Sequence, residues 1–188
     1  MENDHITELV EKPHSNEYRL LNAGVYAFAP SFFAEVENTP RQDGELSLTD
    51  PLIQLLENDE LVRGVKTDEI WRDATYPWDL LSLAQTLLVR PESIATPVVE
   101  TSVYVDNQAI VHDDATLRGP VVIGPDSVIG PQAVVGPDTA IGQNVTVEAG
   151  AVVASSVIDD DTRIGPNATI AECVTGQDAV IDAGTTIP

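Results

Sequence analysis

Cysteine is almost absent from this sequence, and long apolar runs are missing altogether. The single cysteine, Cys173, excludes an intrachain disulfide bond. No run of about 18 apolar residues occurs, so the sequence predicts no membrane-spanning helix. The first residues, Met1 to His5, lack the basic flank and the apolar stretch of a secretory signal. We therefore expect a cytoplasmic protein with no membrane partner.

Positive charge is also scarce. Nine Lys and Arg face 31 Asp and Glu, which gives a formal net charge of −22 at pH 7. Nucleic acid and anionic membrane surfaces bind cationic patches, so this balance argues against both as partners. The acidic residues are spread along the chain, and so much like charge destabilises a compact state unless salt screens it. We predict a halophilic protein from a high-salt cytoplasm, with a merely acidic protein as the alternative.

The first 90 residues show the mixed pattern of an α/β domain. Alternating or short apolar runs, which indicate strands, occupy residues 6–10, 21–28, 61–66 and 69–71. The first expected helix covers residues 30–36. The second has Thr49 or Asp50 as its N-cap and Pro51 at its first helical position. The third begins at Pro77 and ends at Arg90, because Pro91 follows.

From about Val98 onward the sequence has a period of six. Aliphatic residues stand at every sixth position from Val105 to Val153, and the register then shifts by one before Ile158 and again at Thr175. A period of six matches no face of an α-helix. The repeat therefore predicts a structural unit of six residues.

Turn-forming residues hold a fixed place in each unit. Several units carry Pro two positions after the aliphatic residue, and most carry Asp, Asn or Gly at the next position. Pro favours the second position of a type II turn, and the third position needs a positive φ. Each unit is thus a short strand and a corner, and three units close a coil whose stacking buries the aliphatic column. The interior positions we predict are Val111, Ile129, Val147, Ile164 and Ile181.

The repeats resemble the hexapeptides of left-handed parallel β-helix proteins, and Ile164 to Thr169 is an example. The resemblance covers residues 99–188 and implies the fold, whereas such coils occur in acyltransferases, nucleotidyltransferases and carbonic anhydrases. Parallel crossovers are right-handed in most folds, so the left hand rests on the resemblance. The resemblance to these proteins also implies that the chain forms a homo-oligomer, a trimer that assembles through the β-helix.

The first half resembles the C-terminal portion of sugar-1-phosphate nucleotidyltransferases. The segments that carry this resemblance are Val10–Pro13, Asn22–Tyr26, Gly44–Asp50, Trp71–Asp73 and Tyr76–Leu81. Followed by a β-helix, they are similar to archaeal bifunctional enzymes that join a nucleotidyltransferase to a sugar-phosphate acetyltransferase. We therefore expect a partial Rossmann-like α/β domain over 1–90, a linker over 91–98 and the β-helix over 99–188.

The resemblance also implies a site. Nucleotidyl transfer depends on a divalent cation and cationic groups, with little covalent work for the protein. By resemblance, Glu11 holds sugar hydroxyls, Lys12 meets the sugar phosphate, and Asn22 and Gly24 line the sugar pocket. Asp73 is one carboxylate ligand of Mg²⁺, a cation that prefers oxygen donors. The resemblance assigns no other catalytic residue here.

The sequence departs from the family in two ways. It has no Gly-x-Gly-x-Arg-x-x-Pro-x-Thr loop to bind a nucleoside triphosphate, and no upstream position for a second Mg²⁺ aspartate. We expect a fragment or truncated product that is inactive alone.

Three functions remain open at this point. The leading one is transfer of a nucleotidyl group from a nucleoside triphosphate to a hexose or N-acetylhexosamine 1-phosphate. The alternatives are an acyltransferase that uses acetyl-CoA and a non-catalytic oligomerisation fragment. An acyltransferase needs a general base, yet His112 follows a core aliphatic position and is expected in solvent. The Asp159-Asp160-Asp161 run is expected to be a solvated corner rather than a Ca²⁺ site.

The charge balance generates a first test. The melting temperature of the chain should rise between low salt and molar KCl, because salt screens the repulsion within a chain of net charge −22. Circular dichroism melts over a KCl series measure this. A melting temperature that stays constant across the series would favour the merely acidic alternative.

Overall fold

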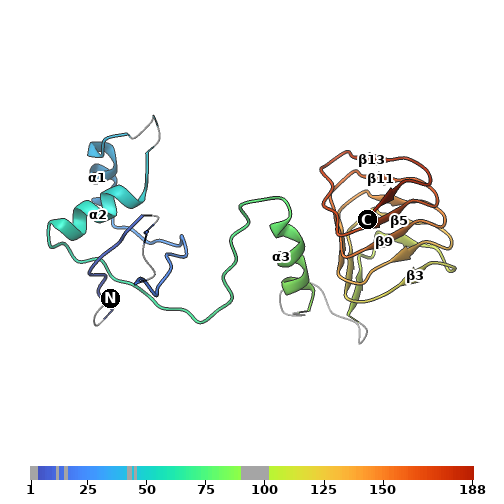
Figure 1. The fold of residues 1–188 in the computed structure, drawn as a ribbon, viewed down its shortest axis with the longest axis horizontal. Helices are drawn as coiled ribbons and strands as arrows, with labels where there is room; N and C mark the ends of the chain where they lie inside the picture. Colours follow the sequence, from blue (N-terminus) through green and yellow to red (C-terminus); the bar gives the residue numbers. More distant parts are fainter. Residues whose placement is uncertain (1–3, 12, 15–16, 42–43, 45, 90–101) are drawn as a thin grey trace. The chain divides into compact units, whose positions relative to one another are not determined.

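The computed structural model describes residues 4–11, 13–14, 17–41, 44, 46–89 and 102–188 (Figure 1). Lys12 and the expected linker 91–98 lie outside the described residues. The chain divides into two compact units, Met1–Trp71 and Arg72–Pro188. None of the described helices is long and apolar enough to cross a membrane. The domain bounds 1–90, 91–98 and 99–188 stay a prediction.

Two helices form in the first unit, close to their predicted places. α1 spans Phe32–Asn38 and α2 spans Thr49–Glu57. The expected N-cap of α2 was Thr49 or Asp50, whereas both lie inside the helix. The N–H of Thr49 instead donates to the hydroxyl oxygen of Ser47 at 3.1 Å, so Ser47 satisfies a donor of the first turn.

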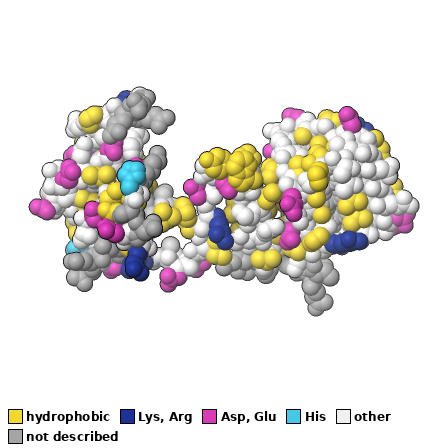
Figure 2. Space-filling view, viewed as in Figure 1, with side chains coloured by type: hydrophobic (Ala, Val, Ile, Leu, Met, Phe, Trp, Pro, Cys, Tyr) yellow, Lys and Arg dark blue, Asp and Glu magenta, His cyan; other side chains and the backbone are white. Residues whose placement is uncertain are grey.

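The four predicted strands of the first half do not build a sheet in the described part of the chain. One antiparallel bridge joins His5 to Arg63, and the N–H of Ile6 donates to the carbonyl oxygen of Val62 at 2.9 Å. Extended segments become stable strands only when a neighbour pairs with them and covers one face. Val65 is 94% exposed, and Figure 2 shows hydrophobic side chains at the surface of this unit.

A small aromatic stack marks the interior of the first unit. Phe28 stacks between Tyr26 and Phe32, with ring centroids 5.3 Å and 3.8 Å away. Phe32, the first residue of α1, is buried, as is Leu52 in α2. These rings tie the segment that follows Asn22 to the first helix.

The second unit contains α3, Asp79–Leu88, followed by a parallel β-helix with three sheets. Sheet I contains β1 (Val103–Val105), β4 (Val121–Ile123), β7 (Thr139–Ile141) and β10 (Val157–Ile158). Sheet II contains β2 (Ile110–Val111), β5 (Val128–Ile129), β8 (Thr146–Val147), β11 (Arg163–Ile164) and β13 (Val180–Ile181). Sheet III contains β3 (Thr116–Leu117), β6 (Val134–Val135), β9 (Val152–Ala154), β12 (Thr169–Ala171) and β14 (Thr186–Ile187).

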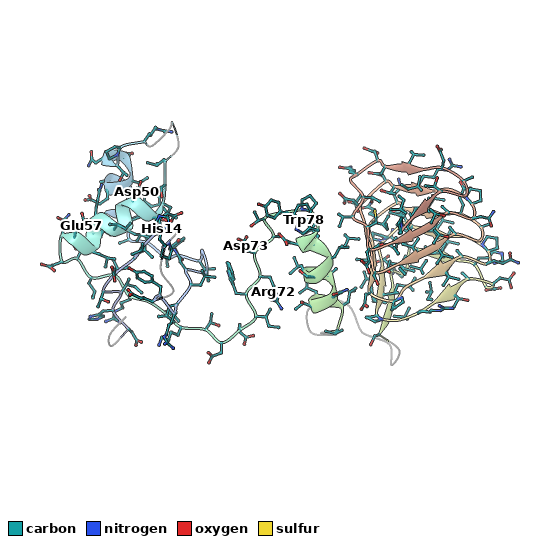
Figure 3. All side chains as sticks on the ribbon, in the orientation of Figure 1. His14, Asp50, Glu57, Arg72, Asp73 and Trp78 are labelled. Carbon is teal, nitrogen blue, oxygen red and sulfur yellow. The ribbon has the colours of Figure 1, made fainter. Side chains whose placement is uncertain are left out.

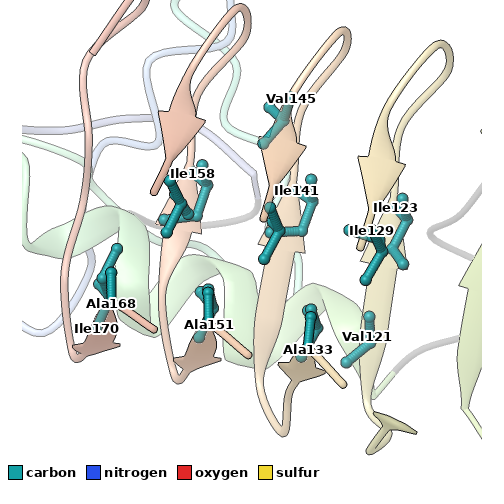
Figure 4. Packing of buried hydrophobic residues seen from close by; sticks show 14 residues of the cluster. Val121, Ile123, Ile129, Ala133, Ile141, Val145, Ala151, Ile158, Ala168 and Ile170 are labelled. Carbon is teal, nitrogen blue, oxygen red and sulfur yellow. The ribbon is translucent and has the colours of Figure 1, made fainter. Parts of the chain in front are cut away.

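The aliphatic column is buried, as the six-residue period predicts. Ile129, Val147 and Ile164 are at most 1% exposed, and successive coils place them in register across sheet II. Val111 and Ile181, in the end coils, are partly buried and pack against the same cluster. Figure 4 shows buried side chains of this cluster, Ile129 among them, pointing into the interior of the coil stack. Each fully buried Val or Ile side chain contributes about 1.5–3 kcal/mol of hydrophobic stabilisation.

The corners adopt the left-handed backbone that the turn pattern predicts. Asp126, Asn144 and Asn167 have φ of 57°, 53° and 57°. Gln132 also has a φ of 60°, although glutamine carries no preference for this region. At Gly150, with φ of 69°, a Cβ atom would lie 2.5 Å from the Asn167 amide oxygen, so a larger residue requires the Asn167 side chain to move.

Thr175 interrupts the aliphatic column for a reason that the structure makes clear. Its side chain is buried, and its hydroxyl accepts a hydrogen bond from the N–H of Asp159 at 2.9 Å. The two five-residue steps, which lead to Ile158 and to Thr175, place Ser155 and Glu172 at positive φ. A hydroxyl in the column therefore satisfies a backbone donor that the shorter corner leaves inside.

The acidic corner at 159–161 forms hydrogen bonds with neighbouring coils. The amides of Asn144 and Gln177 donate to the two carboxylate oxygens of Asp161 at 2.8 Å and 3.1 Å. The N–H of Gln143 donates to Asp160 Oδ1 at 2.7 Å. The hydrogen bonds from Asn144 and Gln177 hold the pKa of Asp161 below its ordinary value.

The burial of the aliphatic column predicts that truncating one of its side chains destabilises the fold strongly. Ile164→Ala should lower the free energy of unfolding by about 2–5 kcal/mol, because it leaves a cavity in a close-packed interior. The matched control is Val180→Ala on the same sheet; Val180 is 62% exposed, so the change should stay within about 0.5 kcal/mol. Urea unfolding at fixed high salt measures both. Similar values for the two variants would contradict the buried column.

The Asp161 hydrogen bonds predict a pH effect. Gln177→Ala removes one amide donor and should raise the pKa of Asp161 toward its ordinary value, whereas Gln143→Ala, whose backbone N–H remains, should not. A depressed folded-state pKa stabilises the fold above the unfolded-state pKa, and this contribution disappears as pH falls through the folded-state pKa. An NMR titration of the Asp161 side chain measures the shift. An unchanged pKa in Gln177→Ala would show that this amide does not stabilise the carboxylate.

Candidate functional site

Asn22 and Gly24, two of the predicted sugar-binding residues, form one tight turn. The N–H of Gly24 donates to Asn22 Oδ1 at 3.1 Å, and the Asn22 side-chain amide donates to the hydroxyl oxygen of Tyr26 at 2.6 Å. Gly24 has a φ of 74°, which a residue with a Cβ adopts only under strain. The turn is therefore built by its own side chains.

A contact from a distant part of the sequence holds this turn. The indole Nε1–H of Trp71 donates to the carbonyl oxygen of Ala23 at 3.1 Å. Two of the short segments that carry the family resemblance thus meet in the first unit, although 48 residues separate them. The sequence analysis missed this contact, and its only signal was the joint occurrence of the two segments.

The other predicted site residues are solvent-exposed or outside the described chain. Glu11 is exposed, and Lys12 is not among the described residues. Asp73 is exposed on the extended segment before α3, where it accepts a hydrogen bond from the Thr75 hydroxyl at 3.1 Å (Figure 3). Asp73 belongs to the second compact unit, whereas Glu11, Asn22 and Gly24 belong to the first.

A metal site needs several ligand side chains close together. Among the described residues, no group of three or more His, Cys, Asp or Glu side chains is placed to hold a metal ion. Mg²⁺ takes octahedral coordination from carboxylates, waters and substrate phosphates. Asp73 belongs to no such group in the described part of the chain, so these residues do not by themselves fit a Mg²⁺ site.

The histidine and the cysteine of the β-helix do not resemble catalytic groups. His112 is exposed, as expected, and its Nδ1 accepts the N–H of Asp114 at 3.2 Å. Cys173 is half-buried, and burial raises the pKa of its thiol, so less of the reactive thiolate forms at neutral pH. Neither arrangement supplies an activated base or nucleophile.

Two families match the chain, in consecutive segments. Residues 1–89 match the family described as nucleotidyl transferase, and residues 117–188 match the one described as GMPPB C-terminal domain. The first match includes the Asn22–Gly24 turn, Trp71 and α3. The second lies entirely within the β-helix.

Several archaeal proteins are similar to the chain. The bifunctional protein GlmU of Methanococcus maripaludis is 35% identical over 116 residues, which cover 60% of this chain and 28% of that protein. The low-salt glycan biosynthesis nucleotidyltransferase Agl11 of Haloferax volcanii is 30% identical, with 62% of this chain and 30% of that protein covered. A bifunctional sugar-1-phosphate nucleotidylyltransferase/acetyltransferase of Sulfurisphaera tokodaii is 28% identical, covering 64% of this chain and 30% of that protein.

The nucleotidyl transferase match includes all the short segments of the first half that resemble this family, and the GMPPB C-terminal domain match lies within the hexapeptide repeats. The chain spans less than a third of the length of these relatives, since the aligned segments cover 28% and 30% of them. In this chain, a segment that matches the nucleotidyl transferase family is followed by a parallel β-helix. Residues 1–89 are therefore similar to the nucleotidyl transferase family, and residues 117–188 are similar to the GMPPB C-terminal domain.

Proposed function

We propose that this protein functions in transfer of a nucleotidyl group from a nucleoside triphosphate to a hexose or N-acetylhexosamine 1-phosphate. One observation carries the proposal: the Asn22–Gly24 turn is held by Trp71 inside the segment that matches the nucleotidyl transferase family. This chain would contribute the part that binds the sugar phosphate. The acetyl-CoA-dependent activity stays the alternative.

The turn is suited to hold a sugar. Gly24 has no side chain, and open space surrounds the position where a Cβ atom would lie, so a ligand can approach the backbone closely. The amide of Asn22 and the hydroxyl of Tyr26 are exposed polar groups beside it. We assign Asn22 and Gly24 to the sugar pocket, Glu11 to the sugar hydroxyls and Lys12 to the phosphate.

Asp73 is proposed as one Mg²⁺ ligand. A bound divalent cation polarises phosphoryl oxygens and neutralises charge that develops on the pyrophosphate leaving group. The described residues place no group of three or more metal-binding side chains together, so we assign to Asp73 only the provision of one carboxylate. Its Oδ2 accepts the Thr75 hydroxyl at 3.1 Å, which orients the carboxylate on an otherwise exposed segment.

We also propose a cytoplasmic homotrimer that assembles through the β-helix and is adapted to high salt. The distribution of charge supports assembly: the strands of the β-helix contain no Asp or Glu, and Arg163 is their single charged residue. Chains with a net charge of −22 approach one another most easily through such faces.

Binding tests the sugar site directly. Calorimetry in molar KCl should detect binding of glucose 1-phosphate or N-acetylglucosamine 1-phosphate to the chain. Asn22→Ala should weaken it up to about tenfold, because one hydrogen-bonding group contributes about 0.5–1.5 kcal/mol. Asn58→Ala, at the exposed end of α2, is the matched control. Binding that is equally strong in both variants would remove Asn22 from the site, and no binding at all would contradict the proposal.

Turnover is a separate measurement. A pyrophosphate-release assay with Mg²⁺, each common nucleoside triphosphate and each sugar 1-phosphate should show none from the 188-residue chain, because its sequence has no triphosphate-binding loop. Turnover that Asp73→Ala abolishes would contradict this expectation and support Asp73 as a ligand. Turnover unchanged by Asp73→Ala would remove Asp73 from the site, and release of thiol from acetyl-CoA would favour the alternative activity.

A further inference from the structure

The three faces of the β-helix differ in what lies against them. α3 packs on sheet I, where it contacts β7 and β10. α3 and the β-helix belong to the same compact unit, although α3 lies within the segment that matches the nucleotidyl transferase family. The nucleotidyl transferase match therefore ends at residue 89, whereas the boundary between the two compact units lies between Trp71 and Arg72.

Sheet I is suited to accept a helix. Side chains alternate along β7, with Thr139 and Ile141 buried, so Ala140 between them points outward. Ala140 pairs in register with Val157 of β10, whose neighbour Ile158 is buried. The outward residues beneath α3 are thus one small and one branched apolar side chain, which allow a helix to approach closely.

α3 presents a matching apolar side. Leu81, Ala84 and Leu88 recur at the spacing of one helical face, and none of them is exposed. Leu88 is 7% exposed, whereas the adjacent Leu87 is 43% exposed, so the helix buries one side only. A helix of ten residues is marginal by itself in water, and it depends on this packing.

We propose that α3 is an intramolecular cover that belongs structurally to the β-helix and withholds the apolar face of sheet I from self-association. Without α3, the outward residues Tyr104, Val122, Ala140 and Val157 would form an uncharged apolar column along the whole sheet. Exposed apolar patches of this kind promote association between copies. The cover restricts assembly through the β-helix to sheets II and III. This inference does not depend on the proposed catalytic activity.

The test compares two adjacent leucines in the full chain at high salt. Leu88→Asp places a charge in the contact with sheet I and should release α3, whereas Leu87→Asp places it on the exposed side. We expect hydrogen exchange of the α3 amides to accelerate at least about tenfold in Leu88→Asp and to stay unchanged in Leu87→Asp. Analytical ultracentrifugation should show Leu88→Asp alone forming species larger than the wild-type assembly.

A second variant keeps the outcome decisive if Leu88→Asp unfolds the unit. Val157→Lys charges the sheet beneath α3, so it should release the helix and, because the bare face is now charged, leave the assembly size unchanged. Exchange in sheets II and III reports whether the β-helix itself stays folded. Full protection of α3 in Val157→Lys would overturn the proposal, as would release of α3 in Leu88→Asp without any larger species.

Discussion

Burial of the aliphatic side chains that recur from coil to coil is the interaction on which the second unit depends. Its strands are two or three residues long, which is too short to be stable in isolation. Each coil gains stability only when coils above and below cover Ile129, Val147 and their equivalents. The parallel ladders place these side chains in register, so every coil adds to one continuous core.

The interior also contains polar side chains, and they are used where the backbone needs them. Ser127 accepts the N–H of Val145 at 2.9 Å and donates to the carbonyl oxygen of Gly142 at 2.8 Å, and Thr175 accepts the N–H of Asp159. No buried side-chain nitrogen or oxygen in the described residues lacks a partner. Corners of different length are therefore accommodated without leaving polar groups unpaired, which would cost about 1–3 kcal/mol each.

The sequence was informative where structure is local and periodic. The aliphatic period placed the interior residues of the β-helix, because burial recurs with each coil. It did not reveal the positive φ of Gln132 or Ser155, since neighbouring coils impose those conformations against residue preference. The strand predictions of the first half failed in the described residues because pairing depends on a partner strand. The family resemblance selected Asn22 and Gly24, but the hydrogen bond from Trp71 to Ala23 is a long-range contact that no local pattern contains.

The arrangement of charge in the β-helix has a consequence for how ions distribute around it. Carboxylates such as Asp126, Asp161 and Asp178 lie at corners, whereas the strands between them are almost free of charge. Successive coils are about 4.8 Å apart, which is shorter than the screening length of about 8 Å at physiological salt. The edge between sheets I and II, where these three carboxylates lie, therefore behaves as a line of negative charge, and cations concentrate along it. The amide of Asn144, bonded to Asp161, separates carboxylates within one such line and lowers their mutual repulsion. Dissolved salt thus screens repulsion between the carboxylates of this edge, whereas the apolar interior and the nearly uncharged strands carry little charge for it to screen.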